Sequence, residues 1–259
     1  MLRIEPGMHT EMISQIGVDA ANRFLVTGSM DKTVRVWDLV TGRLLESLRP
    51  PIGGGEEGKI SAVAISPDGR TVAAGGWTGF EWDQSYSIYL FDRASGKLTQ
   101  RLTGLPNPIL HLAYSPDSRW LVVTLGGKHG MRVYTTTDYA LAAEDRDYGA
   151  GSYGASFDAL GRLATTSDDG FVRLYDQNFL LIARHKAPGG VRPSSISLSP
   201  DGTRIAVGFH DSPQVNVLSG HDLSLRDSPD TSGVTKGDLS KVAWSADGRR
   251  LYAGGKYQV

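Results

Sequence analysis

The segment 53–59, GGGEEGK, has the glycine and lysine spacing of a phosphate-binding loop. Such a loop needs a strand before it, a helix after it, and a serine or threonine after the lysine to hold Mg²⁺. Here two prolines precede the segment, a strand pattern follows it, and Ile60 replaces the hydroxyl residue. Glu56 and Glu57 would also repel a phosphate group. We therefore interpret this segment as a flexible loop rather than a nucleotide site.

Histidines and carboxylates show no spacing that is typical of catalysis or of metal binding. The sequence contains no HExxH pair, no Gly-x-Ser-x-Gly nucleophile motif and no cysteine. Several acidic residues in two loops carry the oxygen ligands that Ca²⁺ prefers. Their spacing matches no known calcium-binding motif, so we expect these carboxylates to be solvated rather than bound to a metal. These are Glu144, Asp145, Asp147, Asp227 and Asp230. We predict no catalytic residue, no metal site and no cofactor.

Residues 77–86, WTGFEWDQSY, concentrate four aromatic side chains in one predicted loop. These are Trp77, Phe80, Trp82 and Tyr86. Aromatic side chains in loops favour partner binding, because they bury a large area at a small entropic cost. The alternative is that they fold back and cover the core of their own sheet, and their exposure distinguishes the two cases. We predict that they bind a partner.

Composition limits the class of protein further. The chain has 259 residues, of which 40% are hydrophobic and 21% charged, as expected for a globular fold. Its 27 basic and 28 acidic residues give a net charge of −1, so no nucleic-acid partner is expected. No apolar run reaches the roughly 18 residues of a membrane span, and the amino terminus lacks the apolar core of a signal peptide. We expect a cytoplasmic protein with no membrane partner.

A turn of the type SPDGR recurs every 41 to 49 residues along the chain. It is followed each time by a short apolar run, such as FLVTGS, TVAAGG or WLVVTL. The turn residues themselves are Asn22, Gly69, Ser118, Gly161, Gly202 and Gly248. Recurrence at such a period indicates a repeat architecture.

The runs around each turn alternate apolar and polar residues and are bounded by Gly, Pro, Asp and Asn, which is typical of short strands. Each period holds about four of them, and no stretch has a capped helical stripe. A four-stranded sheet cannot bury its apolar face alone, whereas sheets arranged radially bury their faces against each other. The sequence therefore predicts an all-β fold, a β-propeller of four-stranded antiparallel blades.

Residues 26–42, VTGSMDKTVRVWDLVTG, resemble the WD-repeat propellers, and the similarity extends from about His9 to the end of the chain. The resemblance implies a structural hydrogen-bonded set in the first copy. Its members are His9, Ser29, Asp31 and Trp37. Later copies are divergent; the fourth keeps Ser167 and Asp169 but has Tyr175 for the tryptophan and Tyr148 at the histidine position.

We expect one propeller domain over residues 1–259, with about five complete blades and a partial sixth. The blades are expected near 9–49, 59–104, 108–144, 152–186, 191–226 and 238–259. The last copy has two recognisable strands, and residues 2–5, LRIE, are candidates for an outermost strand that closes the ring. Because a further strand is still missing, we expect the chain to be a fragment of a longer protein.

Three functions agree with these features. The resemblance favours a non-catalytic scaffold or sensor module that binds a protein or peptide on its loop-rich face. The second possibility is that the chain is the recognition domain of a larger enzyme, because related arrays in bacteria are often attached to caspase-like peptidases, kinases or NTPases. Its partners would then include other domains of the same parent protein. The third possible function is that of a propeller hydrolase or lyase.

Two histidines, His129 and His210, are expected in loops on the same face as the aromatic loop, so we add them to the candidate binding residues. If the protein is an enzyme, the candidates for catalysis are these two histidines together with Arg146 and Arg192.

Overall fold

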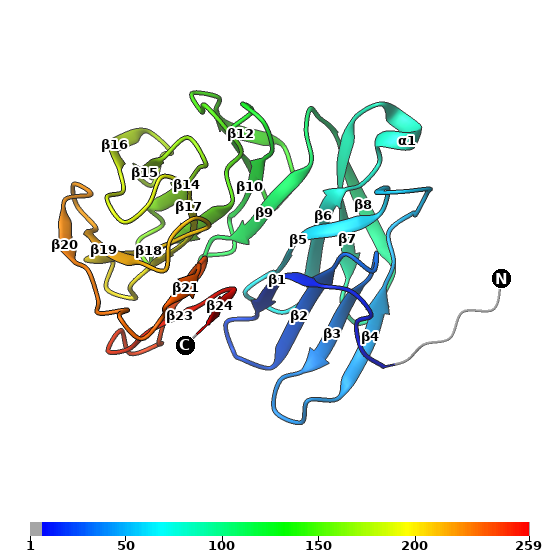
Figure 1. Cartoon of the computed structure of the whole chain (residues 1–259). Helices are drawn as coiled ribbons and strands as arrows, with labels where there is room; N and C mark the ends of the chain where they lie inside the picture. Colours follow the sequence, from blue (N-terminus) through cyan, green and yellow to red (C-terminus); the bar gives the residue numbers. More distant parts are fainter. Residues whose placement is uncertain (1–6, 259) are drawn as a thin grey trace. The chain divides into compact units, whose positions relative to one another are not determined.

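The structure is a computed structural model that describes residues 7–258, and within these residues the fold is almost entirely β-strand (Figure 1). The candidate closing strand at residues 2–5 lies outside the described residues. The strands form five four-stranded sheets, in each of which consecutive strands are neighbours, and two two-stranded sheets. The prediction of an all-β fold built from repeated four-stranded blades is confirmed.

Each four-stranded sheet contains strands that follow one another in the sequence. The first contains β1 (Ile13–Val18), β2 (Phe24–Ser29), β3 (Val34–Asp38) and β4 (Leu44–Leu48). The second contains β5 (Lys59–Ile65), β6 (Thr71–Trp77), β7 (Tyr86–Asp92) and β8 (Leu98–Leu105). The third contains β9 (Ile109–Tyr114), β10 (Trp120–Leu125), β11 (Met131–Thr135) and β12 (Leu141–Asp145).

The remaining sheets continue this order. The fourth contains β13 (Gly154–Phe157), β14 (Leu163–Thr166), β15 (Phe171–Tyr175) and β16 (Leu181–Lys186). The fifth contains β17 (Pro193–Leu198), β18 (Arg204–Phe209), β19 (Val215–Ser219) and β20 (Leu225–Asp227). The two-stranded sheets pair β21 (Lys236–Gly237) with β24 (Tyr257–Gln258) and β22 (Lys241–Trp244) with β23 (Leu251–Gly254).

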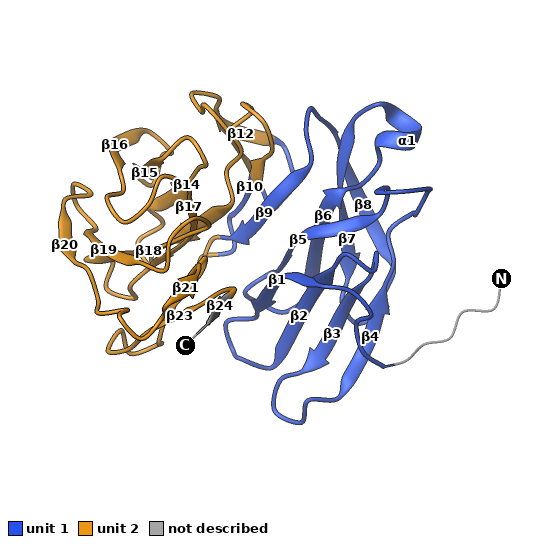
Figure 2. Cartoon of the chain, in the orientation of Figure 1, with its two compact units in different colours: residues 1–114, 118–123, 135–140 blue, residues 115–117, 124–134, 141–259 orange. Residues whose placement is uncertain are grey.

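The chain forms two compact units, shown in blue and orange in Figure 2. The first two sheets belong wholly to unit 1, and the fourth and fifth sheets belong wholly to unit 2. In unit 1, one core cluster joins buried residues of the first two sheets, among them Val26, Val36, Ile60 and Tyr89. In unit 2, a second cluster joins the fourth and fifth sheets through residues such as Leu174, Ile205 and Phe209. The first and second sheets thus bury their apolar faces against each other, and so do the fourth and fifth sheets.

The six turn residues singled out in the sequence share one backbone conformation. All have a positive φ, with values of 52°, 74°, 62°, 84°, 67° and 66° from Asn22 to Gly248. Glycine and asparagine tolerate this left-handed region best, which explains five of the six residue types; Ser118 is the exception. The recurring turn therefore reflects one backbone requirement rather than one side-chain contact.

An arginine after three of these turns donates a hydrogen bond to a backbone carbonyl in the turn of the next copy. The pairs are Arg23 Nη2 with Asp68 O at 2.9 Å, Arg162 Nη2 with Gly202 O at 2.6 Å, and Arg204 Nη2 with Gly248 O at 2.7 Å. Two of these arginines also bind a carboxylate of their own turn: Arg23 binds Asp19 at 2.8 Å and Arg162 binds Asp158 at 2.7 Å. These arginines link successive sheets within a unit.

A single helical turn, α1 (Phe80–Asp83), interrupts the strand pattern inside the aromatic loop. It begins after Gly79, with φ 95°, and ends at Gln84, with φ 53°. The sequence predicts no helix here, because four residues are too few to show apolar side chains repeating at helical spacing. Two left-handed residues therefore define a compact loop between β6 and β7.

Candidate functional site

The first copy contains a hydrogen-bonded set centred on Thr27. Its hydroxyl lies 2.7 Å from His9 Nε2 and accepts a hydrogen bond from Trp37 Nε1 at 2.9 Å. The other ring nitrogen of His9 lies 2.8 Å from Asp31 Oδ2. Asp31 also accepts from the Thr33 hydroxyl and from the backbone N–H of Thr10. The set thus joins the segment before β1 to β2 and β3 and satisfies polar groups that the fold removes from water.

Ser29 contacts this set through Asp31 rather than through Trp37. Its hydroxyl donates to the Glu11 carbonyl at 3.2 Å and accepts from the Asp31 N–H at 3.1 Å, so it does not contact Trp37. Trp37 pairs with Leu25 across β2 and β3, which makes Thr27 its diagonal neighbour, within reach of an indole. Ser29 lies two residues farther along β2, which places it about 7 Å beyond Thr27 in the strand direction. Thr27 was therefore missed, and the strand register would have been needed to find it.

The fourth copy repeats this arrangement with other residues. Tyr148 OH lies 2.6 Å from Thr165 Oγ1 and 2.9 Å from Tyr175 OH, and Tyr175 OH donates to Asp145 Oδ2 at 2.8 Å. Burial raises the pKa of Tyr148 to about 12. In place of a histidine, Arg173 binds Asp169 at 2.7 Å and lies 3.9 Å from the centre of the Tyr148 ring. A phenol and a guanidinium thus replace the imidazole of the first copy.

The aromatic loop forms a pocket in unit 1, which we call the aromatic pocket. Phe80 stacks on Tyr86 with ring centres 5.1 Å apart, and Trp77 meets Tyr86 edge to face at 6.0 Å. Trp77 is 39% exposed and Phe80 43%, and α1 buries none of its residues. The pocket has a volume of about 530 Å³. It is lined by Gly54, Glu56, Glu57, Trp77, Phe80, Glu81, Gln84 and Tyr86.

Trp82 stands apart from the other three aromatic residues. It is 48% exposed on α1 and does not line the aromatic pocket. The structure therefore brings three of the four predicted binding residues together and leaves the fourth on the adjoining surface.

Glu57 fixes the loop that carries the pocket. Its two carboxylate oxygens accept hydrogen bonds from the backbone N–H groups of Gly79 and Glu81, the second at 3.1 Å. These amides belong to the start of α1, so the segment interpreted as a flexible loop instead holds the helix through a buried side chain. Sequence analysis could not identify this role, because a glutamate in a glycine-rich segment normally indicates solvated charge.

The two candidate histidines belong to unit 2. His129 is half-buried between β10 and β11. His210 follows β18, and its ring meets Tyr153 edge to face at 5.1 Å. Burial lowers the pKa of His210, and the nearby charge of Asp168 opposes that shift. Asp168 binds Arg192 at 2.6 Å, and Arg146 binds Glu144 at 2.9 Å.

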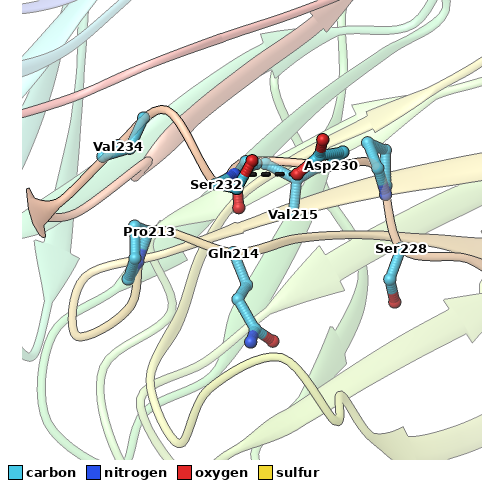
Figure 3. Close-up of a pocket in the computed structure, with 9 residues that line it drawn as sticks. Pro213, Gln214, Val215, Ser228, Asp230, Ser232 and Val234 are labelled. Carbon is cyan, nitrogen blue, oxygen red and sulfur yellow. Dashed lines mark hydrogen bonds between the residues drawn. The ribbon is translucent and has the colours of Figure 1, made fainter. Parts of the chain in front are cut away.

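The acidic loop residues are engaged by protein groups. Asp147 binds Arg184 at 2.6 Å, and Asp145 accepts from Tyr175 as described above. Asp230 accepts from the Ser232 N–H at 2.9 Å, beside a hollow of unit 2 lined mainly by small and polar side chains such as Gln214 and Ser228 (Figure 3). Within residues 7–258, no three His, Cys, Asp or Glu side chains gather in a way that could hold a metal ion.

These observations define the class of protein. Sheets of four consecutive strands, joined by turns of one conformation and packed face to face within each unit, are blades of a β-propeller. The family model described as WD domain, G-beta repeat, matches residues 7–38 and 48–86. These two matches lie in the first two blades, which therefore resemble WD repeats, and the later four-stranded sheets repeat the same fold. In the described part of the chain, no helix has the length and apolarity needed to span a bilayer.

Several curated proteins are similar to parts of the chain. The small ribosomal subunit protein RACK1y of Oryza sativa subsp. japonica is 36% identical over 98 residues, which cover 38% of this chain and 25% of that protein. The small ribosomal subunit protein RACK1 of Caenorhabditis elegans is 31% identical over 121 residues, covering 46% and 33%. Telomerase protein component 1 of Mus musculus is 27% identical over 210 residues, covering 78% and 7%. In each case the match spans a third or less of the relative's own length.

Proposed function

We propose that this chain is a non-catalytic binding module that captures a protein or peptide partner on the surface around the aromatic pocket. WD-repeat relatives such as the RACK1 proteins support an interaction role, since they are named as proteins of the small ribosomal subunit. The blades supply a rigid scaffold, and function in such folds resides in the loops that the scaffold presents.

The observation that carries the proposal is the exposure of Trp77, Phe80 and Trp82 on a loop held by Glu57. Aromatic residues that served only to cover the core would be buried. Here α1 leaves its aromatic side chains in water, which costs free energy unless a partner covers them. A rigid loop also loses little conformational entropy when it binds.

The test is affinity capture from lysate of the source organism, with the chain immobilised and bound proteins quantified by mass spectrometry. We expect Trp82→Ala and Trp77→Ala to lower recovery of a specific partner about tenfold, as for central interface residues. Val40→Ala is the control, because Val40 is also exposed apolar surface, at 86%, but lies between β3 and β4. Unchanged recovery by both tryptophan variants, with wild-type melting temperatures, would refute the proposal.

A further inference from the structure

The aromatic pocket combines aromatic walls with negative charge. Three of its lining residues are carboxylates, Glu56, Glu57 and Glu81, and none is a lysine, arginine or histidine. Its volume of about 530 Å³ falls within the range of pockets that hold a side chain or small ligand. A pocket with this composition is suited to a cation, because aromatic faces attract positive charge.

Glu57 is the buried carboxylate of this pocket, whereas Glu56 and Glu81 are exposed. It is only 8% exposed, and both of its oxygens bind backbone N–H groups rather than a charged side chain. Among the described residues, it forms no ion pair. Buried carboxylates are usually paired with a cation, so the charge of Glu57 remains available to a positively charged group from outside. Burial raises the pKa of the Tyr86 phenol, and the negative charge of Glu57 raises it further.

Glu81 adds a second, exposed carboxylate to the lining of the pocket. A Cβ built at Gly53 would lie 1.5 Å from Glu81 Oε2, so this carboxylate lies directly over the glycine backbone. Nearby cations are already engaged: Lys32 Nζ donates to the Gly53 carbonyl at 3.0 Å, and Lys59 binds Glu56 at 2.9 Å. Glu57 and Glu81 therefore contribute two carboxylates that have no ion-pair partner in the described chain.

We propose that the aromatic pocket receives a positively charged arginine or lysine side chain of the partner, which rests on the binding role proposed above. The cationic group lies against the exposed face of Phe80, whose other face stacks on Tyr86, and Glu57 and Glu81 neutralise its charge. The aliphatic part of the side chain contacts Trp77. The apolar walls alone would accept many residues, and the two carboxylates select a cation among them.

The test uses N-acetyl-arginine-N-methylamide as the probe and its citrulline analogue as a neutral control of nearly the same shape. Binding is followed by NMR through the indole N–H resonances of the five tryptophans. We expect the arginine probe to shift the Trp77 resonance saturably and to bind at least about tenfold more tightly than the citrulline probe. The resonances of Trp37, Trp120 and Trp244 serve as internal references. Higher salt should weaken the arginine probe but not the citrulline probe.

Variants separate charge from shape. Glu81→Gln should weaken the arginine probe about three- to tenfold without changing the citrulline probe, and Phe80→Leu should act in the same direction by removing a π face. Glu11→Gln, which changes an exposed glutamate outside the pocket, should leave both unchanged. Melting temperatures identify any variant that fails to fold, in which case the two probes on the wild-type chain still decide.

Equal binding of the arginine and citrulline probes, or no shift of Trp77 by either, would overturn the selection of a cation. That result is distinct from failure of the proposed function. If Trp82→Ala and Trp77→Ala abolish capture while the arginine probe does not bind, the surface binds a partner that presents no cation to the pocket. If the arginine probe binds but capture is unaffected, the pocket selects cations and the captured protein uses another surface.

Discussion

The Thr27 hydroxyl accepts a hydrogen bond from the Trp37 indole at 2.9 Å and lies 2.7 Å from the His9 imidazole. One side-chain oxygen in β2 thereby connects β3 to the segment before β1. Thr27 is buried, so neither partner can replace this contact with water without opening the sheet. The stability of the first blade therefore depends on this single oxygen.

Replacing Thr27 with valine keeps the shape of the side chain but removes the acceptor. We expect Thr27→Val to lower the free energy of unfolding by about 2–3 kcal/mol, because Trp37 and His9 lose a buried partner. Urea denaturation at neutral pH measures the change. Ser29→Ala is the comparison, with an expected loss of about 1 kcal/mol from its two backbone contacts. An equal or larger loss for Ser29→Ala would show that Thr27 is not the centre of the set.

Arg162 and Arg23 make the same type of contact in different surroundings. The carboxylates Asp158 and Asp19 are both buried, but the Arg162 side chain is only 18% exposed and also donates to the Gly220 carbonyl, whereas the Arg23 side chain is 53% exposed. We expect Arg162→Ala to cost about 3–4 kcal/mol, because it leaves a buried carboxylate unpaired. Arg23→Ala should cost less, about 1 kcal/mol, because the exposed guanidinium of Arg23 is already screened by water, which can also reach Asp19 in the variant. Equilibrium unfolding of both variants tests this order, which similar losses would contradict.

The ion pair between Asp169 and Arg173 predicts sensitivity to acid. Burial opposes the ionisation of Asp169, but hydrogen bonds from Arg173, Gly149 and Phe171 outweigh it and hold the pKa below its ordinary 3.8. Because the folded pKa is depressed, this stabilisation is present above about pH 4 and is lost as the pH falls through the folded value. Unfolding free energies between pH 6 and 2 should decline more steeply for the wild type than for Asp169→Asn. Parallel curves would exclude the pair as a source of acid sensitivity.

The two linked phenols predict an effect at alkaline pH. Burial raises the pKa of Tyr148 to about 12, and burial beside Tyr148 and Asp145 raises that of Tyr175 as well. Since both folded values exceed the ordinary value of 10, their stabilisation is complete below pH 10 and is lost as the pH rises toward 12. Absorbance of tyrosinate should show these two residues ionising only with unfolding. Tyr148→Phe should reduce the rise in tyrosinate absorbance that accompanies unfolding. Ionisation of all tyrosines near pH 10 in the folded state would contradict the raised pKa values of Tyr148 and Tyr175.

The sequence was informative where one residue type answers one backbone requirement. Asn22 and the glycines of the recurring turn were identified because few residues adopt a positive φ. It was less informative where a side chain acts across strands. Thr27 and Ser29 face the same side of β2, so alternation alone could not choose between them, and only the register does.

The candidate site shows the same limit. The aromatic cluster was visible in composition, but its division into a pocket with Trp77, Phe80 and Tyr86 and a separate Trp82 depends on the one-turn helix. Glu57 belongs to a segment interpreted as a flexible loop, whereas its carboxylate binds backbone amides more than twenty residues away along the chain. Such long-range contacts leave no local periodic signal.

The arginines that follow the turns have a consequence for how these repeats can diverge. Each donates to a backbone carbonyl of the next turn, and every residue type carries that carbonyl. A substitution in the receiving turn therefore leaves the acceptor in place, provided that the backbone keeps its path. Point mutations can accumulate in one copy without requiring a compensating change in the copy before it. The three receiving turns, SPDGR, SPDGT and SADGR, offer this carbonyl at Asp68, Gly202 and Gly248.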